Sequence, residues 1–335
     1  MSVFATATGL GSWPGTSARQ AAEIVVGELH SLTHLVELPA RGVGADLVGR
    51  AGALLVDIAI DTVPRGYRLT NRPGSVTRRA ASLLGEDLDA LEEAWENAGL
   101  RSSGRPVKVQ APGPITLAAY LELPGGHRAI TDAGALRDLT ASLVEGVRAH
   151  RVEVARRLET TVVVQLDEPA LPAALRGRLT GVTALTPVHP VDEQVAVGLL
   201  DECARIAEEV AVHCCAPDVP WDVLRRSGVH AVAIDTAVLG ADGLDGLGEF
   251  VDSGRTVQLG VVPAVEPATR PAVDEVAASV AALTDRLGFP RQVLRERIGV
   301  TPACGLAGAT PKWARTAVEL CQKAADGIAA DPESI

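Results

Sequence analysis

The sequence has few aromatic residues, few positive charges and no long apolar run. Phe, Trp and Tyr make up 3% of the 335 residues, and the net charge is −11. Nucleic acids and anionic membrane surfaces are bound by clustered Lys and Arg, so we exclude both as partners. A membrane span needs roughly 20 consecutive apolar residues, and a secretory signal needs a basic region and a cleavage site; neither is present. We therefore expect a cytoplasmic protein.

Cysteine is also scarce, with five residues in the chain. A reducing cytoplasm keeps thiols free, so these cysteines are free thiols or metal ligands and not a disulfide framework. Cys203 and Cys321 lie in helical patterns and are predicted to be core residues. Apolar residues make up 47% of the sequence and charged residues 22%, with Ala, Val, Leu and Gly abundant. That composition is typical of a packed α/β protein.

Short β-branched segments alternate with longer helical patterns along the chain. Such alternation indicates βα units around a parallel sheet. Eight strands are the number that closes a TIM barrel, so we predict a single (β/α)8 domain over residues 1–330. The predicted strands span 3–11, 34–39, 106–113, 161–169, 210–215, 231–237, 256–263 and 298–305.

Helical patterns between these strands have the length of helices that connect parallel strands. They span 17–30, 136–158, 192–209 and 271–287. The gap between the second and third predicted strands is too long for one such connection. We predict a helical insertion over 39–105, with helices at 46–59 and 75–97 and an exposed turn around PRGYRLTNRPG.

Polar residues gather where the predicted strands end. In a TIM barrel the carboxyl ends of the strands and the loops after them form the active site. We therefore expect these residues at one end of the barrel: Gly11, Ser12, Glu37, Gly113, Thr116, Asp167, Glu168, His213, Cys215, Asp235 and Cys304.

His213 and Cys215 are two positions apart, so both side chains can point into the barrel mouth while Cys214 points into the packing. That spacing alone is more often structural than metal-binding. Cys304, in a turn after the last predicted strand, can approach the same point, and Asp235 offers an oxygen. One imidazole, two thiolates and a carboxylate are a suitable tetrahedral set for zinc.

Six motifs, in this order and spacing, resemble the catalytic barrel of cobalamin-independent methionine synthase. They are GLGSWPGT, GPITL, QLDEPAL, VHCC, AIDTA and TPACGLAG, and the resemblance extends from about residue 6 to residue 320. It implies a catalytic zinc held by His213, Cys215, Asp235 and Cys304. The family usually has Glu at the acidic position, so we expect the shorter Asp235 to be the ligand that exchanges.

The resemblance also implies a substrate and a reaction: transfer of a methyl group to the thiol of homocysteine, which forms methionine. Zinc would ionise that thiol, which is only about 3% thiolate at pH 7 when free. Glu37 and Asp167 would bind the ammonium group of homocysteine. The backbone N–H groups of Gly11 and Ser12 would bind its carboxylate.

The methyl donor is implied to lie beside Gly113, Thr116 and Tyr120, with Tyr120 where the family places a tryptophan. The loop after the seventh predicted strand, GVVPAVEPATRP, lacks the histidine that the family uses to help protonate a folate leaving group. We therefore expect a methylcorrinoid, free or carried by a corrinoid protein, to be used more readily than methyltetrahydrofolate. Glu266 in that loop is the first residue to test as a substitute acid.

Other interpretations of these residues stay open. Asp167 and Glu168 could cap the helix that begins near PALPAALRG, but they face opposite ways and are not a glycosidase pair. A related zinc-dependent alkyltransferase that acts on coenzyme M would share the metal ligands without needing Glu37 and Asp167. A non-catalytic barrel would have a structural zinc closed by four strong ligands.

Overall fold

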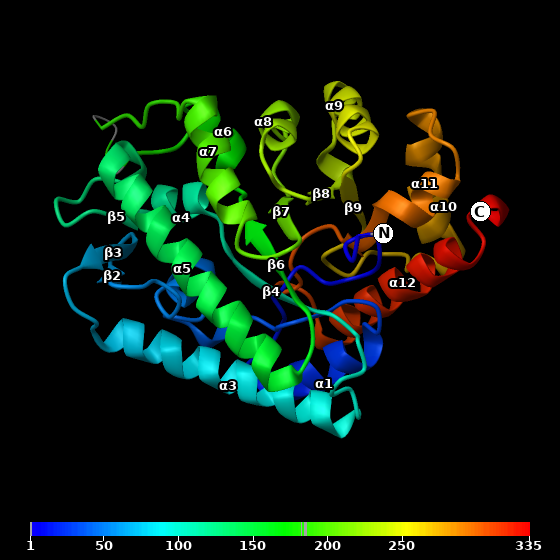
Figure 1. Cartoon of the computed structure of the whole chain (residues 1–335), viewed down its shortest axis with the longest axis horizontal. Helices are drawn as coiled ribbons and strands as arrows, with labels where there is room; N and C mark the ends of the chain where they lie inside the picture. Colours follow the sequence, from blue (N-terminus) through cyan, green and yellow to red (C-terminus); the bar gives the residue numbers. More distant parts are fainter. Residues whose placement is uncertain (1, 182, 184–185) are drawn as a thin grey trace.

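A curled sheet of seven parallel strands forms the centre of the protein in a computed structural model, which describes residues 2–181, 183 and 186–335 (Figure 1). The strand order is β1-β4-β6-β7-β8-β9-β10, and helices connect the strands in the α/β manner of TIM barrels. Each strand overlaps one of the last seven predicted strands. Their bounds are β1 (Thr33–His34), β4 (Val107–Pro112), β6 (Val162–Asp167), β7 (Val210–Cys214), β8 (Ala231–Asp235), β9 (Thr256–Val262) and β10 (Ile298–Pro302).

The predicted first strand, 3–11, is not a strand. The segment makes isolated parallel bridges on both sides: Ala7 pairs with β10, and Ser12 pairs with the chain just beyond β1. Gly11 has a φ angle of +106°, outside the extended region, and this interrupts a continuous ladder. The prediction of eight strands is therefore confirmed for seven, and an irregular segment contacts both edges of the sheet.

Helices surround the sheet, and several begin at a side chain that caps the helix. Ser17, Asp132, Asp192 and Thr310 each accept a hydrogen bond from a backbone N–H of the first turn. No helix in the described part of the chain is long and apolar enough to cross a membrane. The helices are α1 (Ala18–Glu28), α3 (Ser75–Asn97), α4 (Pro114–Tyr120), α5 (Ala133–Leu158), α6 (Leu171–Leu175), α7 (Glu193–Ala204), α8 (Trp221–Arg226), α9 (Ala241–Asp252), α10 (Val273–Arg286), α11 (Gln292–Arg297) and α12 (Pro311–Ala330).

The segment 39–105 is less helical than predicted. Helix α3 has the predicted bounds, but the helix predicted at 46–59 is only α2 (Leu47–Ala51). Residues 52–58 form turns, and an antiparallel hairpin of β2 (Ala59–Val63) and β3 (Gly66–Thr70) then replaces most of the expected exposed turn. Strand β3 also pairs with β5 (Leu121–Glu122), so this hairpin belongs to a separate three-stranded sheet. The β-branched and aromatic residues of the hairpin favour this outcome.

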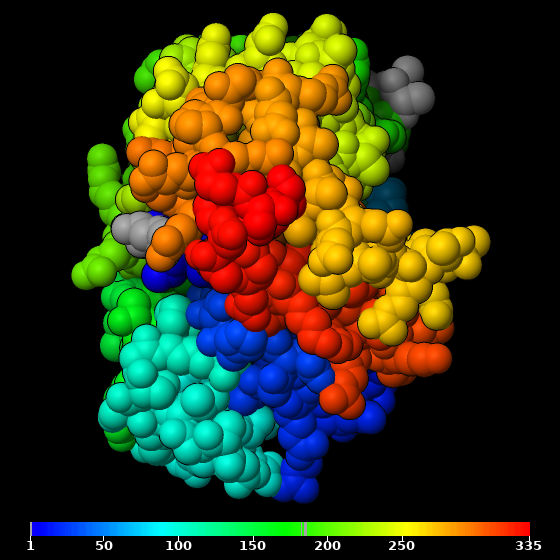
Figure 2. All heavy atoms as spheres, turned by 90° about the vertical axis from the view of Figure 1, so that its right-hand side faces the viewer, coloured from blue at the N-terminus to red at the C-terminus, as the bar shows by residue number. Residues whose placement is uncertain are grey.

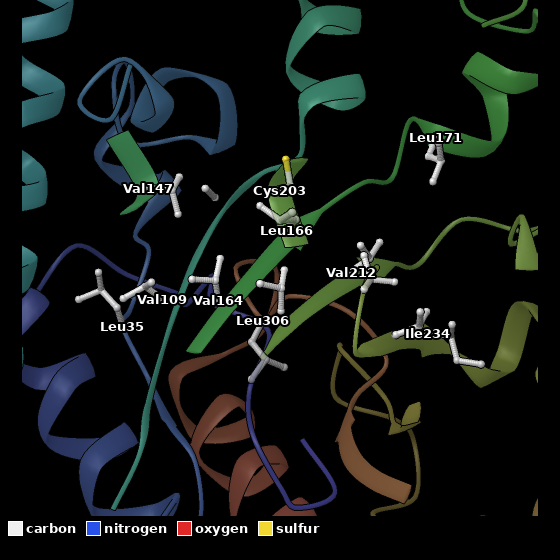
Figure 3. Packing of buried hydrophobic residues seen from close by; sticks show 14 of the residues in the cluster. Leu35, Val109, Val147, Val164, Leu166, Leu171, Cys203, Val212, Ile234 and Leu306 are labelled. Atoms are coloured by element: carbon white, nitrogen blue, oxygen red, sulfur yellow. The ribbon is translucent and has the colours of Figure 1, made fainter. Parts of the chain in front are cut away.

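Aliphatic side chains fill the space between the sheet and the helices. Cys203 and Cys321 are fully buried among them, as predicted. With so few aromatic residues, the core depends on Val, Leu, Ile and Ala. Figure 3 shows part of this cluster, in which Val109, Val164, Val212 and Ile234 come from four neighbouring strands and Cys203 belongs to a helix that covers them.

The two ends of the described chain pack together. Helix α1 contacts α12, and Figure 2 shows the blue N-terminal segments against the red C-terminal ones. The N–H of Leu306, in the loop after β10, donates to the carbonyl of Ser12 at 2.9 Å. This contact brings the first and last segments to the carboxyl ends of the strands, where the predicted site residues lie.

Candidate metal centre

Three of the four predicted metal ligands meet at the carboxyl ends of the strands. His213 is in β7, Cys215 follows β7 directly, and Cys304 follows β10. One ligand atom from each lies within 4.8 Å of the others. The Sγ atoms of Cys215 and Cys304 are 3.1 Å apart. As the alternation of the strand predicts, Cys214 is fully buried in the packing and takes no part.

The imidazole of His213 is oriented by Asp167. Its Nδ1 atom lies 2.7 Å from Oδ1 of Asp167, and both side chains are buried. Its Nε2 atom is buried without a hydrogen-bond partner among the described residues. Metal-binding histidines commonly donate one ring N–H to a carboxylate and coordinate through the other nitrogen. A borderline-soft dication such as zinc fits this imidazole and two sulfur atoms.

The electrostatics of the cluster favour a thiolate on Cys304. The hydrogen bond from Cys215 and the neighbouring His213 hold the pKa of Cys304 down to about 4, although burial acts in the opposite direction. Accordingly the pKa of Cys215 is raised. Burial lowers the pKa of His213, but its contacts with Asp167 and Cys304 outweigh burial and raise that pKa to about 9. A thiolate is the form of cysteine that binds metals.

A cavity of about 230 Å3 opens beside the three ligands. Among the predicted substrate residues, Ser12, Glu37 and Asp167 line this cavity. Gly11 lies behind it, where its carbonyl accepts the N–H of Glu37 at 3.1 Å. A Cβ atom at residue 305 would lie 2.0 Å from Oγ of Ser12, so glycine at this position lets the first and last segments approach each other beside Cys304.

Glu37 is a buried carboxyl group with one unused oxygen. Its Oε1 atom makes no hydrogen bond among the described residues. Nε of Arg50 lies 3.7 Å from that oxygen, and the Arg50 guanidinium is itself paired with the buried Asp87 of α3. Burial raises the pKa of Glu37 to about 7, despite the attraction of Arg50. Glu37 therefore lines the cavity with a buried carboxyl group whose Oε1 atom makes no hydrogen bond among the described residues.

Asp235, the fourth predicted ligand, is not in the three-residue group. Its Oδ1 atom accepts the N–H of Ala237 at 2.9 Å and caps the short turn that follows β8. It lines a neighbouring hollow and not the cavity beside His213. Burial raises its pKa, and the charges at His213 and Cys304 act on it more weakly. The carboxylate is therefore near the metal centre without touching it.

Glu168 points away from the cavity and holds the start of α4. Its oxygens accept the N–H groups of Ile115 and Thr116, at 2.9 and 2.8 Å, and the Thr116 hydroxyl at 2.6 Å. A Cβ atom at Gly113 would lie 2.3 Å from Oε1 of Glu168. Glu168 therefore caps a helix, as the alternative interpretation expected. The capped helix is α4, however, and not the helix α6 that follows Glu168 in the chain. Gly113 and Thr116 therefore have a structural role here.

Tyr120 and Glu266, which were predicted to lie near the methyl donor, are outside the cavity. Tyr120 ends α4 and is 44% exposed. Glu266 is exposed in the loop after β9, and its carboxylate lies 3.4 Å from the hydroxyl of Thr310. Neither residue lines the space beside the metal ligands.

Four buried charged or amide residues around the site were not singled out from the sequence: Arg50, Asp87, Lys108 and Gln165. The sequence contained a signal for three of them. Asp87 interrupts the apolar face of α3, between Leu84 and Leu91. Lys108 and Gln165 are polar residues within strands whose every position is buried. A polar residue in such a strand must point into the interior, where it needs a partner.

Comparisons with known proteins give the family. Residues 4–327 match the family described as the cobalamin-independent synthase catalytic domain. A B12-independent methionine synthase from Shewanella sp. W3-18-1, solved in complex with selenomethionine, is 12% identical with a TM-score of 0.62, and all of both chains are covered. A Listeria monocytogenes protein assigned as a vitamin-B12-independent methionine synthase is 12% identical with a TM-score of 0.56, over 96% of each chain. No curated protein matches. The chain belongs to the family of cobalamin-independent synthases and, as the motifs predicted, is a methyltransferase with their catalytic domain.

Proposed function

We propose that the protein transfers a methyl group to the thiol of homocysteine, with zinc held by His213, Cys215 and Cys304. The observation that carries this proposal is the position of the three ligands beside a cavity that Glu37 and Asp167 also line. A fully closed structural site would have four strong protein ligands. Asp235 is the fourth candidate, and because it is not part of the three-residue group, an open position for the substrate sulfur is supported.

The reaction forms a bond between sulfur and the methyl carbon and breaks the bond between that carbon and the donor, which leaves with the electron pair. When bound, zinc would keep the substrate thiol deprotonated, and since two protein thiolates already balance its charge, the sulfur would stay nucleophilic. Asp167 holds the ring of His213, and Glu37 offers an unused oxygen to the substrate ammonium group. Full ionisation of the thiol corresponds to about a thirtyfold gain in nucleophile, or about 2 kcal/mol.

Two buried carboxyl groups beside the cavity favour an amino-acid thiol over coenzyme M. Glu37 and Asp167 would attract an ammonium group, whereas the sulfonate of coenzyme M would be repelled. The Shewanella relative, of the same fold, was solved with selenomethionine, an analogue of the product expected here.

For the donor, we favour a methylcorrinoid, free or on a corrinoid protein, over methyltetrahydrofolate. The nitrogen of the folate leaves poorly unless it is protonated, and the loop after β9 contains no histidine. Glu266 is the one carboxyl residue of that loop sequence, and it is exposed. A corrinoid leaves without a proton, so this chain's residues suffice for that donor.

The irregular segment that contains Ala7 and Ser12 would complete a barrel of the TIM type, because it bridges β10 on one side and the chain just beyond β1 on the other. On this view residues 1–330 form one catalytic domain, and 39–105 is an insertion that supplies Arg50 and Asp87 beneath Glu37.

The direct test is methionine formation by the purified, zinc-loaded protein. Homocysteine and coenzyme M are offered in turn as methyl acceptors, each with methylcobalamin and with methyltetrahydrofolate. Methionine formed with either donor supports the proposal. Methylation of coenzyme M at a comparable rate, or no product with any pair, contradicts it.

A further inference from the structure

We propose that Lys108 and Gln165 are positioning residues, which determine that His213 presents its Nε2 atom to the metal. This inference rests on the proposed zinc site but concerns residues that do not touch the metal. Lys108, Gln165, Asp167 and His213 form one hydrogen-bonded chain across β4, β6 and β7. The direction of each bond in this chain follows from the donors and acceptors that surround Gln165 and Asp167.

Lys108 is fully buried in β4. Its Nζ atom donates to the carbonyl of Gly9 at 2.6 Å and to the side-chain oxygen of Gln165. An ammonium group only donates hydrogen bonds, so it requires an oxygen from each neighbour. Lys108 therefore holds the amide of Gln165 with its oxygen toward β4.

The other contacts of Gln165 require the same orientation. Its Nε2 atom donates to the carbonyl of Leu10 at 3.2 Å and to Oδ1 of Asp167 at 2.8 Å. Both of these atoms are acceptors. A flipped amide would place oxygen against two acceptors and NH2 against the ammonium group, so only one orientation is compatible with the surroundings.

Asp167 connects Gln165 to His213. Its Oδ1 atom accepts from Gln165 and lies 2.7 Å from Nδ1 of His213. As a carboxylate it can only accept, so Nδ1 of His213 must carry a proton. A histidine that binds a metal is neutral, so its other nitrogen then has the lone pair that coordinates, and Nε2 is the atom that lacks a hydrogen-bond partner. Nε2 is thus left free to coordinate.

Packing alone does not account for Lys108. The strand that carries it buries Val107 and Val109 as apolar residues, and an apolar side chain at 108 would avoid the cost of burying a charge. Burial lowers the pKa of Lys108 to about 7. A buried lysine whose contacts all serve to orient neighbours is better explained by its effect on Gln165 than by filling space.

The test compares two changes in the chain with a matched change outside it. Lys108→Met and Gln165→Met each remove one member of the chain with little change in volume. Gln258→Met is the control, because Gln258 is also fully buried in the sheet but its amide has no partner among the described residues. We expect the zinc Kd, measured by chelator competition, to rise about 10- to 100-fold in the first two and to stay unchanged in the control.

A double variant separates this role from a general loss of stability. If Lys108 acts through Gln165, the zinc Kd of Lys108→Met/Gln165→Met should be no worse than that of the worse single variant, whereas independent effects would multiply. Unchanged zinc Kd in both single variants, or equal losses in the Gln258→Met control, would overturn the inference.

Crystal structures of the metal-free variants test it apart from the proposed function. The distance from Nδ1 of His213 to Oδ1 of Asp167 should stay near 2.7 Å in the wild type and in Gln258→Met and lengthen beyond hydrogen-bond range in Gln165→Met. A wild type that bound no zinc would contradict the proposed function. The distance between His213 and Asp167 would still test the positioning role, because it is measured without metal. An intact contact in Gln165→Met would refute that role.

Discussion

The sulfur atoms of Cys215 and Cys304 lie 3.1 Å apart although 89 positions separate them in the chain. Both cysteines are free, and the contact between them lowers the pKa of the Cys304 thiol to about 4. His213 adds a nitrogen to the pair.

The protein should bind about one zinc ion per chain, and Cys215→Ser or Cys304→Ser should remove most of it, because each deletes a sulfur ligand. Asp235→Ala should cost less, since this carboxylate caps a turn outside the group. Metal content after dialysis is the measurement.

Cys214→Ala is the matched control for the cysteine changes, because it removes a neighbouring thiol that is buried in the packing. It should retain zinc. Retention of the metal in both Cys215→Ser and Cys304→Ser would rule out the site, and a larger loss from Asp235→Ala would reverse the ranking of the ligands.

Glu37→Gln should keep zinc and weaken homocysteine binding by about 1.5 to 3 kcal/mol, the scale of a charge-assisted hydrogen bond. Asp167→Asn should weaken homocysteine binding as well, but it should also weaken zinc binding through its contact with His213. Calorimetry with each ligand separates the two effects. A wild type that methylates simple thiols without an amino group as well as homocysteine would contradict the role of Glu37.

Gly113→Ala should lower the free energy of unfolding by about 1 to 3 kcal/mol, because its Cβ atom would lie 2.3 Å from Glu168. Gly27→Ala in α1 is the control, since its Cβ atom would meet no atom within 4 Å. That change should raise stability by up to about 1 kcal/mol. Denaturant unfolding measures both changes in the free energy of unfolding. Equal changes in the two variants would show that the side chain of Glu168 moves aside at little cost.

Methylcobalamin should give a faster initial rate of methionine formation than methyltetrahydrofolate, and loss of the general acid should cost the folate reaction on the order of a hundredfold. A rapid folate-dependent rate without any corrinoid would show that another residue supplies the proton. Glu266→Gln would then identify or exclude the first candidate.

Acid should destabilise the protein partly through His150 of α5. Burial lowers the pKa of His150 to about 3, and the nearby Arg50 adds to this effect. The unfolded chain therefore binds a proton below about pH 6.5 that the folded chain does not, and the free energy of unfolding falls as pH falls. His150→Leu should remove roughly 1.5 kcal/mol of the loss between pH 6.5 and 5. Denaturant unfolding at both pH values measures this loss, and the exposed His127→Leu is the control. A loss in His150→Leu as large as in the wild type would contradict the prediction.

The sequence allowed the family and seven strands to be predicted, because short motifs and the alternation of residues along a strand are local features. It also allowed the grouping of His213, Cys215 and Cys304 to be expected, because strand order places the ends of β7 and β10 at the same edge. Alternation in β7 separates His213 and Cys215 from Cys214 whatever the rest of the chain does. The hairpin β2–β3 was missed because its third partner, β5, lies about 50 residues further along the chain. Propensity within 46–70 could not reveal that pairing.

The contacts of buried carboxylates were harder to predict for the same reason. Asp167 and Glu168 are adjacent and face opposite ways, as the strand period requires. Which neighbour each one meets depends on the packing of other elements: β7 supplies His213 to Asp167, and α4 supplies two N–H groups to Glu168. Asp235 was assigned as a metal ligand by its motif. In the structure its carboxylate accepts the N–H of Ala237 in the turn that follows β8.

The joining of the first and last segments at the cavity has a consequence during synthesis. A ribosome adds about 5 to 20 residues per second, so Cys304 is made roughly 5 to 20 s after Cys215. Until then the nascent chain offers only two of the three ligands, and Ser12 waits for the loop that contains Leu306. Contacts between such distant parts of a chain form late in folding. The proposed metal site is therefore completed late in the synthesis of the chain, when Cys304 joins His213 and Cys215.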